Sequence, residues 1–127
     1  MKKIISTPQA PAAIGPYSQA IQKNDLLFVS GQLAIDPATG LFVEGGIKEQ
    51  TAQVFKNIKA ILTEAGFTLA DIVKTTVFLA DMSDFAAFNE VYASNFESSF
   101  PARSAVAVKT IPKNGLVEIE CIAMNEP

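Results

Sequence analysis

The one arginine of this chain, Arg103, comes directly after Phe100-Pro101-Ala102, at the start of a stretch of strand-forming residues. Pro101 fixes its own φ angle and pushes Phe100 towards an extended backbone, so the chain that leads into Arg103 is stiff. A guanidinium on a stiff mount is suited to bind a carboxylate, because its paired N–H donors match two oxygens. The alternative is a surface arginine or an ordinary salt bridge, and the position in the sequence leaves both open.

Two carboxylates near the end of the chain, Glu118 and Glu120, alternate with Val117, Ile119 and Cys121. In a strand this alternation places both carboxylates on one face. Like charges at this spacing raise the pKa of one carboxyl when the pair is partly buried, and such a carboxyl can exchange a proton with water. The alternative is a half-exposed strand with an ordinary polar face.

Four further positions have side chains or backbone suited to a ligand. Tyr17 follows Gly15-Pro16, and its phenol can hydrogen-bond a ligand, although such rings more often pack at a core edge. Ser30 and Gly31 close a predicted strand, where the glycine allows a ligand or another strand to approach the backbone. Asn89 falls inside a predicted helix, where a solvent-facing asparagine is the ordinary interpretation.

The absent residue types exclude several kinds of site. The chain has no histidine and one cysteine, Cys121, so it holds neither a Ser–His or Cys–His nucleophile pair nor an ordinary zinc site. The full dinucleotide-binding and P-loop patterns are also absent. We therefore expect no metal and no cofactor, and chemistry based on carboxylates, tyrosine, lysine, backbone groups and Arg103.

Length and composition predict a single domain over residues 1–127, with 49% apolar residues to form its core. No apolar run is long enough to span a bilayer, and prolines interrupt the stretch after the basic start, so we expect neither a membrane nor a signal peptide. A lone cysteine fits a reducing compartment, and we expect a cytoplasmic protein. The net charge of −3 and the scattered lysines argue against a nucleic-acid partner.

Hydrophobic spacing and turn residues predict the elements that must position these side chains. A helix with Ile47, Val54 and Ile58 inside and Gln53 mainly outside ends at Gly66, and a second helix begins at Ser83 as N-cap and turns Phe85, Phe88, Val91 and Tyr92 inward. In the strand between them, Val73, Thr75, Val77 and Leu79 should share one side. The first fifteen residues are interpreted as an extended arm, and strands are predicted at 17–23, 26–31, 41–43, 72–81, 104–110 and 116–124.

This order of elements predicts an α+β fold, in which both helices pack on one face of a single mixed six-stranded sheet. The other face of such a sheet then needs a cover. Alanine, valine and isoleucine fill many of the remaining strand positions, so a second chain is a natural cover and we expect an oligomer.

Blocks along nearly the whole chain resemble, in order, the motifs of the RidA (YjgF-type) family. The blocks are Ala13-Ile14-Gly15-Pro16-Tyr17-Ser18-Gln19-Ala20, Phe28-Val29-Ser30-Gly31-Gln32, Asn57-Ile58, Val73-Lys74-Thr75-Thr76-Val77-Phe78-Leu79, Phe88-Asn89-Glu90-Val91-Tyr92, Phe100-Pro101-Ala102-Arg103-Ser104 and Val117-Glu118-Ile119-Glu120-Cys121-Ile122-Ala123.

The resemblance implies a chorismate-mutase-like fold and a homotrimer with clefts between its subunits. It also implies a 2-iminobutanoate/2-iminopropanoate deaminase, an enzyme that hydrolyses small 2-imino acids to 2-oxo acids and ammonia. RidA itself uses no metal or organic cofactor. The alternative function is a non-catalytic trimer that binds a small carboxylate, such as a 2-oxo acid, as a sensor.

The resemblance also assigns roles residue by residue. Arg103 takes the place of the arginine that grips the substrate carboxylate, and Glu118 that of the acidic residue that orients or activates water. The remaining matched positions lie in or near the cleft: Tyr17, Ser30, Gly31 and Asn89. Many relatives have a cysteine two residues after the arginine, where this chain has Ala105, which weakens any thiol-linked role but not a hydrolysis by water.

Overall fold

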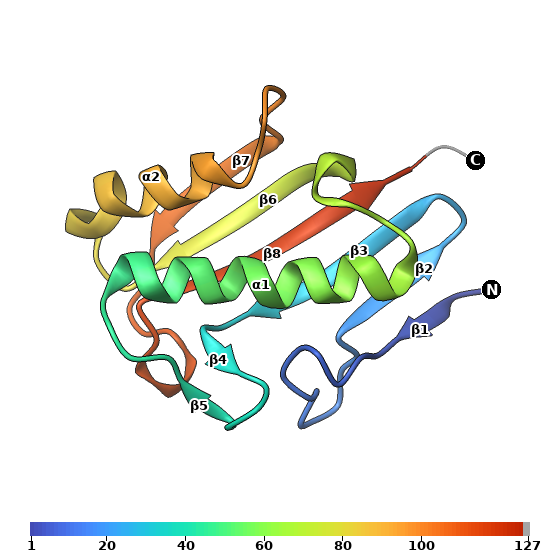
Figure 1. Ribbon diagram of the computed structural model, residues 1–127, viewed down its shortest axis with the longest axis horizontal. Helices are drawn as coiled ribbons and strands as arrows, with labels where there is room; N and C mark the ends of the chain where they lie inside the picture. The colour runs from blue at the N-terminus through green and yellow to red at the C-terminus, as the bar shows by residue number, and fades with distance from the viewer. Residues whose placement is uncertain (126–127) are drawn as a thin grey trace.

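The computed structural model describes residues 1–125, which form one sheet with two helices on one of its faces (Figure 1). The six strands of the sheet lie in the order β1-β2-β3-β8-β6-β7. Neighbouring strands are antiparallel except β6 and β7, which are parallel, so the sheet is mixed as predicted. The elements are β1 (Lys3–Ile5), β2 (Ala20–Lys23), β3 (Leu26–Gln32), β4 (Ile35–Asp36), β5 (Leu41–Phe42), α1 (Ile47–Ala65), β6 (Ile72–Leu79), α2 (Phe85–Ser94), β7 (Ala102–Ala107) and β8 (Val117–Met124).

The long helix α1 forms where the apolar spacing predicts it. Val54 and Ile58 are fully buried against the sheet. Gly66 ends the helix in the left-handed conformation at φ 81°, and its N–H donates to the carbonyls of Leu62 and Thr63. The prediction that Gln53 lies mainly on the outside of this helix is wrong. Its side chain is buried and donates to Asn57 Oδ1 at 2.9 Å.

The second helix starts later than predicted. Ser83 is not its N-cap, because Asp81 accepts a hydrogen bond from the Ser83 backbone N–H at 2.8 Å and closes a 3-10 turn over Met82–Asp84. The helix α2 then begins at Phe85 and buries Phe88 and Tyr92 fully, while Val91 is only half-buried.

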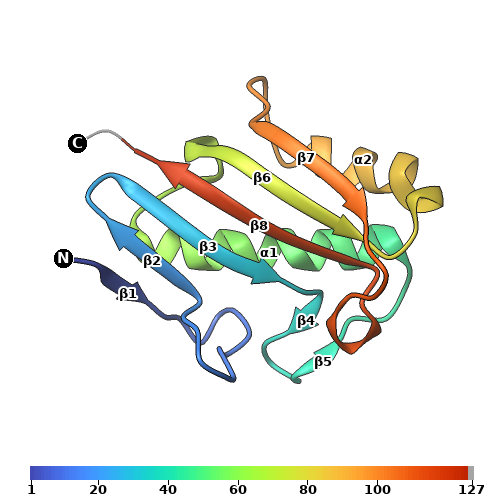
Figure 2. The ribbon, with the colours of Figure 1, turned by 180° about the vertical axis from the view of Figure 1, so that it is seen from behind.

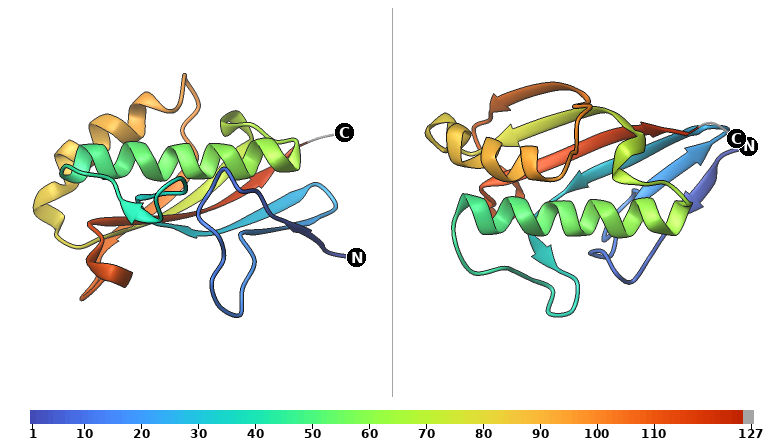
Figure 3. Two further views of the ribbon diagram at one scale, coloured as in Figure 1. Left: turned by 60° about the horizontal axis from the view of Figure 1, so that its bottom comes forward. Right: turned by 45° about the horizontal axis from the view of Figure 1, so that its top comes forward.

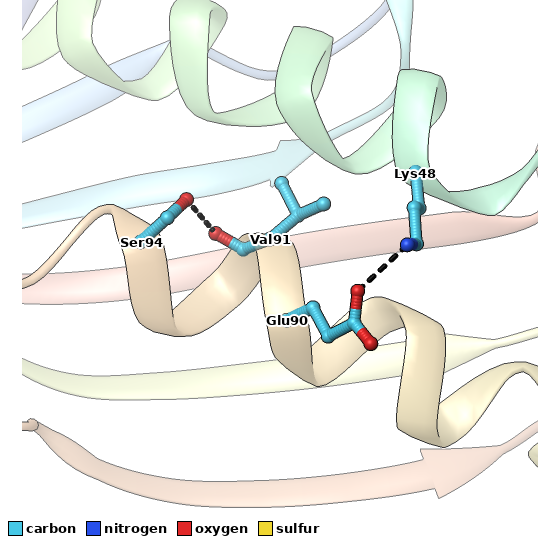
Figure 4. Close-up of polar contacts among 4 residues, drawn as sticks. All are labelled: Lys48, Glu90, Val91 and Ser94. Atoms are coloured by element: carbon cyan, nitrogen blue, oxygen red, sulfur yellow. Dashed lines mark hydrogen bonds and ion pairs between the residues drawn. The ribbon is translucent and has the colours of Figure 1, made fainter.

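One exposed ion pair joins the two helices. Lys48 on α1 reaches Glu90 on α2 at 2.6 Å between Nζ and Oε2, and Figure 4 shows this contact beside the bond from Ser94 Oγ to the Val91 carbonyl. Because both charged side chains are exposed, solvent and salt screen their attraction, and the pair contributes little to the packing of the helices.

The strand β6 shows where simple alternation fails. Thr75, Val77 and Leu79 share the buried face as predicted, but Val73 is exposed. The pairing with β8 shifts register between Ile72 and Lys74, so Ile72 takes the buried position in place of Val73.

Several strand boundaries also differ from the prediction. The arm contributes the edge strand β1, which pairs with β2 and supplies the sixth strand of the sheet. β4 and β5 form a separate two-stranded ribbon, so the segment predicted at 41–43 lies outside the main sheet. β2 starts only at Ala20, β6 ends at Leu79, and β7 covers Ala102–Ala107, so Arg103 lies inside the strand that was expected to follow it.

The two faces of the sheet have different surroundings. The helix-covered face holds the core, and Leu27, Val77 and Ile119 on it are fully buried. Figures 2 and 3 show that no helix covers the opposite face, here called the bare face. Apolar side chains there stay exposed, namely Ile4 (63%), Phe28 (46%), Val106 (49%) and Met124 (47%). Within the described residues, no helix is long and apolar enough to cross a membrane.

The left-handed cap of α1 gives a stability prediction. We expect Gly66→Ala to lower the free energy of unfolding by about 1 kcal/mol, because a Cβ in this conformation meets the following carbonyl. No other atom lies within 4 Å of that Cβ, so backbone strain is the whole effect. Urea unfolding at one fixed protein concentration measures it. Gly66→Asn is the matched variant and should lose less, and equal losses in both would contradict the explanation.

Candidate active site

The side chain of Arg103 lies on the helix-covered side of the sheet, against α2. Its Nη1 donates to Asn89 Oδ1 at 2.8 Å, and its guanidinium carbon lies 4.7 Å from the ring centroid of Tyr92 and 5.3 Å from that of Phe85. A third ring, that of Phe88, lies at 5.9 Å. Aromatic faces attract and orient a guanidinium, while the bond to Asn89 uses only one of its five N–H donors. The group is therefore fixed in place and keeps donors for a carboxylate.

Tyr92 supports the guanidinium from inside the fold. Its hydroxyl and Thr75 Oγ1 share a hydrogen bond of 2.7 Å, which holds the ring in one orientation. Burial raises the pKa of Tyr92, with smaller opposing effects from the Thr75 hydrogen bond and the charge of Arg103, so the phenol stays neutral. The spacing of Phe85, Phe88 and Tyr92 was interpreted as core packing alone, and nothing in a helical period indicates that a charge lies over those rings.

Glu118 lies on the bare face, where its carboxylate packs against Gly31 of the neighbouring strand β3. A Cβ added to Gly31 would lie 2.9 Å from Glu118 Cδ, so the carboxylate fills the space that any side chain at position 31 would need. The glycine was predicted to let a ligand or another strand approach the backbone, and in this chain the Glu118 side chain makes that approach. The absence of a side chain at Gly31 leaves the space in which the Glu118 carboxylate lies.

Two features of this chain raise the pKa of the Glu118 carboxyl. Partial burial raises the pKa of Glu118, and the nearby charge of Glu120 adds to the effect. Glu120 shares the face, as the alternation predicts, but it is exposed. A carboxyl with a raised pKa can take a proton from water and return it within one reaction cycle.

Tyr17 and Ser30 lie together at a hollow of the bare face, which Phe28 and Glu120 also line. The Ser30 hydroxyl donates to the Ser18 carbonyl at 2.6 Å, and its backbone N–H donates to the Gln19 carbonyl at 3.0 Å. The Tyr17 side chain is exposed at the rim. These contacts tie the segment that carries Tyr17 to the strand that carries Ser30 and Gly31.

The buried side chain of Gln19 holds the arm that leads to Tyr17. Its Oε1 accepts from the Thr7 backbone N–H at 2.7 Å, and its Nε2 donates to the Pro11 carbonyl at 2.8 Å. Sequence reasoning assigned Gln19 no role. The only available signal was a polar side chain directly before the buried start of a strand.

Cys121 and the acidic residues offer neither a reactive thiol nor a metal site. Cys121 is buried, and desolvation raises the pKa of its thiol to about 12, so it is an inert core residue. Across the described residues, no group of three histidine, cysteine, aspartate or glutamate side chains is placed to hold a metal ion.

The site residues form two groups on opposite sides of the sheet. Arg103 and Asn89 lie on the helix-covered side, whereas Tyr17, Ser30, Gly31 and Glu118 lie on the bare face. Arg103 pairs with Thr75, which pairs with Cys121, and Glu118 lies three residues before Cys121 in β8. Standard strand spacings put the two backbones about 10 Å apart across the sheet and about 10 Å apart along it. A single chain therefore does not bring Arg103 and Glu118 together.

The raised pKa of Glu118 has a consequence for stability. A carboxyl whose pKa is raised on folding contributes stability below its ordinary pKa of 4.5, and this contribution is lost as the pH rises through the folded value. We therefore expect Glu118→Gln to gain stability relative to the wild type as the pH rises above 4.5. Urea unfolding across this range measures the difference. Glu97→Gln removes an exposed carboxylate elsewhere in the fold and is the control. If the stability of the wild type instead rose relative to that of Glu118→Gln with rising pH, the raised pKa of Glu118 would be contradicted.

Many known proteins are similar to this chain in sequence and in structure. Residues 7–125 match the model of the family described as endoribonuclease L-PSP. A protein of Bos taurus named 2-iminobutanoate/2-iminopropanoate deaminase is 52% identical over 100% of this chain and 93% of its own length.

Solved structures agree with these sequence matches. A crystal structure of RidA from the Antarctic bacterium Psychrobacter sp. is 50% identical, with a TM-score of 0.93 over 97% of this chain and 99% of its own. A crystal structure of E. coli TdcF with bound serine is 42% identical, with a TM-score of 0.94 over 98% of this chain and 99% of its own. With the expected motifs in place and the fold shared over almost its whole length, the chain belongs to the endoribonuclease L-PSP family, which includes RidA.

Proposed function

We propose that this protein hydrolyses 2-iminobutanoate and 2-iminopropanoate to 2-oxo acids and ammonia. Relatives at about half identity over the full chain carry the name of this activity. The observation that carries the proposal is Glu118, a half-buried carboxyl with a raised pKa that occupies the space left beside Gly31. A protein that only binds a carboxylate needs Arg103 but has no use for such a proton-transfer group.

The active site in this proposal is shared between the chains of a homotrimer with the chorismate-mutase-like arrangement. The exposed apolar side chains of the bare face favour association, because burying them removes apolar surface from water. Arg103 and Glu118 lie on opposite sides of one sheet, so Arg103 of one protomer would meet Glu118 of its partner in a cleft between them. We expect three such clefts in the trimer.

In the proposed mechanism, Arg103 binds the substrate carboxylate through two N–H donors and holds the C=N carbon near Glu118. The Glu118 carboxylate takes a proton from a water molecule as its oxygen adds to the carbon of the protonated imine. The carbinolamine then receives that proton on its nitrogen and expels ammonia, while its hydroxyl proton passes to Glu118 and the C=O bond forms. Glu118 releases this proton to solvent, which restores its carboxylate. Tyr17 and the backbone at Ser30 and Gly31 hold the imine nitrogen. Hydrolysis of an activated imine requires only positioning and proton transfer, so we propose no metal or cofactor.

A non-catalytic carboxylate-binding trimer is the second candidate. The E. coli relative crystallised with serine favours it, because that ligand is a small carboxylate without a reactive imine. The family description names an endoribonuclease, but the net charge of −3 makes a nucleic-acid partner unfavourable, and we expect none. A cytoplasmic location stays a prediction from the lone cysteine.

An assay with trapped imine tests the function. Threonine dehydratase generates 2-iminobutanoate in the presence of semicarbazide, and the protein should lower the rate of semicarbazone formation. We expect Arg103→Lys and Arg103→Ala to reduce this effect by about 100-fold, since each loses the paired charge-assisted hydrogen bonds to the carboxylate. Lys48→Ala, at an exposed helix residue, is the control and should keep wild-type activity.

Unchanged trapping by folded wild-type protein would favour the carboxylate-binding trimer. Full activity in Arg103→Lys would instead show that a bidentate grip on the carboxylate is unnecessary.

A further inference from the structure

The side chain of Asn57 is fully buried in the middle of α1 and holds the end of the strand that carries Ser30 and Gly31. Its Nδ2 donates to the carbonyl of Leu33 at 3.0 Å and to that of Ile35 at 2.9 Å. Its Oδ1 accepts from Gln53 Nε2 at 2.9 Å. Both amide protons are thus used on backbone carbonyls, one directly after β3 at Leu33 and one at Ile35, the first residue of β4.

The strand end that Asn57 holds is irregular. Val29 pairs with Cys121 and Gln32 pairs with Ile119, so two residues of β3, Ser30 and Gly31, face a single residue of β8. This is a β-bulge, which bends a strand and breaks its ladder of hydrogen bonds. The geometry of the bulge therefore depends on contacts outside the sheet.

Contacts on both sides fix the bulge. On the N-terminal side, the Ser30 hydroxyl and N–H bind the carbonyls of Ser18 and Gln19. On the C-terminal side, Gln32 Nε2 donates to the Ser30 carbonyl at 3.2 Å, and the Asn57 clamp begins at the next residue, Leu33. The clamp is the only one of these contacts that anchors the bulge to a helix.

We propose that Asn57 is a positioning residue for the reaction: by clamping Leu33 and Ile35 it sets Gly31, and through Gly31 it sets the Glu118 carboxylate. The inference rests on the proposed hydrolysis, but its structural part does not need it. Asn57 touches no substrate and acts only through the backbone of β3. Arg103 lies on the other side of the sheet and is not reached by the clamp.

The test compares Asn57→Leu with Gln53→Leu. Both variants place a leucine at a buried position of the same helix and break the bond between the two amides, but only Asn57→Leu loses the two bonds to the backbone. We expect Asn57→Leu to lower kcat by about tenfold, because small displacements of a catalytic group are costly, with KM changed by less than about twofold. Gln53→Leu should keep kcat within about twofold of the wild type.

A second readout separates positioning from simple loss of stability. In Asn57→Leu the released Glu118 carboxylate becomes better solvated, so we expect its pKa to fall towards the ordinary value of 4.5, both in the pH profile of kcat and in a carboxyl NMR titration. Gln53→Leu should leave the Glu118 pKa where the wild type has it. If Asn57→Leu does not fold, Asn57→Ser replaces it in the same comparison.

The outcomes are distinct. Equal kcat and equal Glu118 pKa in the two leucine variants would overturn the role of Asn57. If the wild type lacks activity, the hydrolysis fails, and the NMR titration alone decides the clamp: a lowered pKa in Asn57→Leu supports it and an unchanged pKa refutes it.

Discussion

Successive residues of a β-strand point to opposite faces of a sheet, and this alternation separates the arginine from the carboxylate in this protein. Arg103 shares the helix-covered side with Thr75 and Tyr92, whereas Glu118 points to the bare face, two strands away. The same alternation leaves Phe28 and other apolar side chains without a cover on that face. Association with further copies of the chain would bury the bare face. It would also bring Arg103 of one chain and Glu118 of another to one cleft.

Each half of the site is rigid for a different physical reason. The guanidinium of Arg103 lies over three aromatic rings and is oriented by Asn89, so its direction is set by packing and by one hydrogen bond. The carboxylate of Glu118 lies in the space left by the missing side chain of Gly31, beside the backbone of a β-bulge. Rigid placement suits a reaction that needs little chemistry from the protein. Most of the proposed rate enhancement then comes from orientation and from one well-placed proton acceptor.

Residue patterns within a single helix or strand correctly predicted the features that depend on that element alone. The helical spacing up to Gly66 and the alternation from Val117 to Cys121 gave α1 and the shared face of Glu118 and Glu120 correctly. The prediction that Val73 shares one side with Thr75 was wrong, because a register shift beside Lys74 is decided by pairing with another strand. The order of the strands is likewise a tertiary property, so the sequence did not reveal that one chain keeps Arg103 and Glu118 apart. The rings under Arg103 were missed because core and charge-supporting aromatics have the same spacing.

Mixing two inactive variants tests the shared site most directly. Arg103→Ala and Glu118→Gln, each inactive alone, are unfolded, combined in equal amounts, refolded and assayed for imine hydrolysis, with native mass spectrometry to verify mixed trimers. If neighbouring chains supply the two residues, each cleft receives both intact residues in about one quarter of cases, so activity should return to about a quarter of the wild-type level. If one chain supplies both residues, no cleft in any mixed trimer is complete. Mixed trimers without recovered activity would therefore contradict this account.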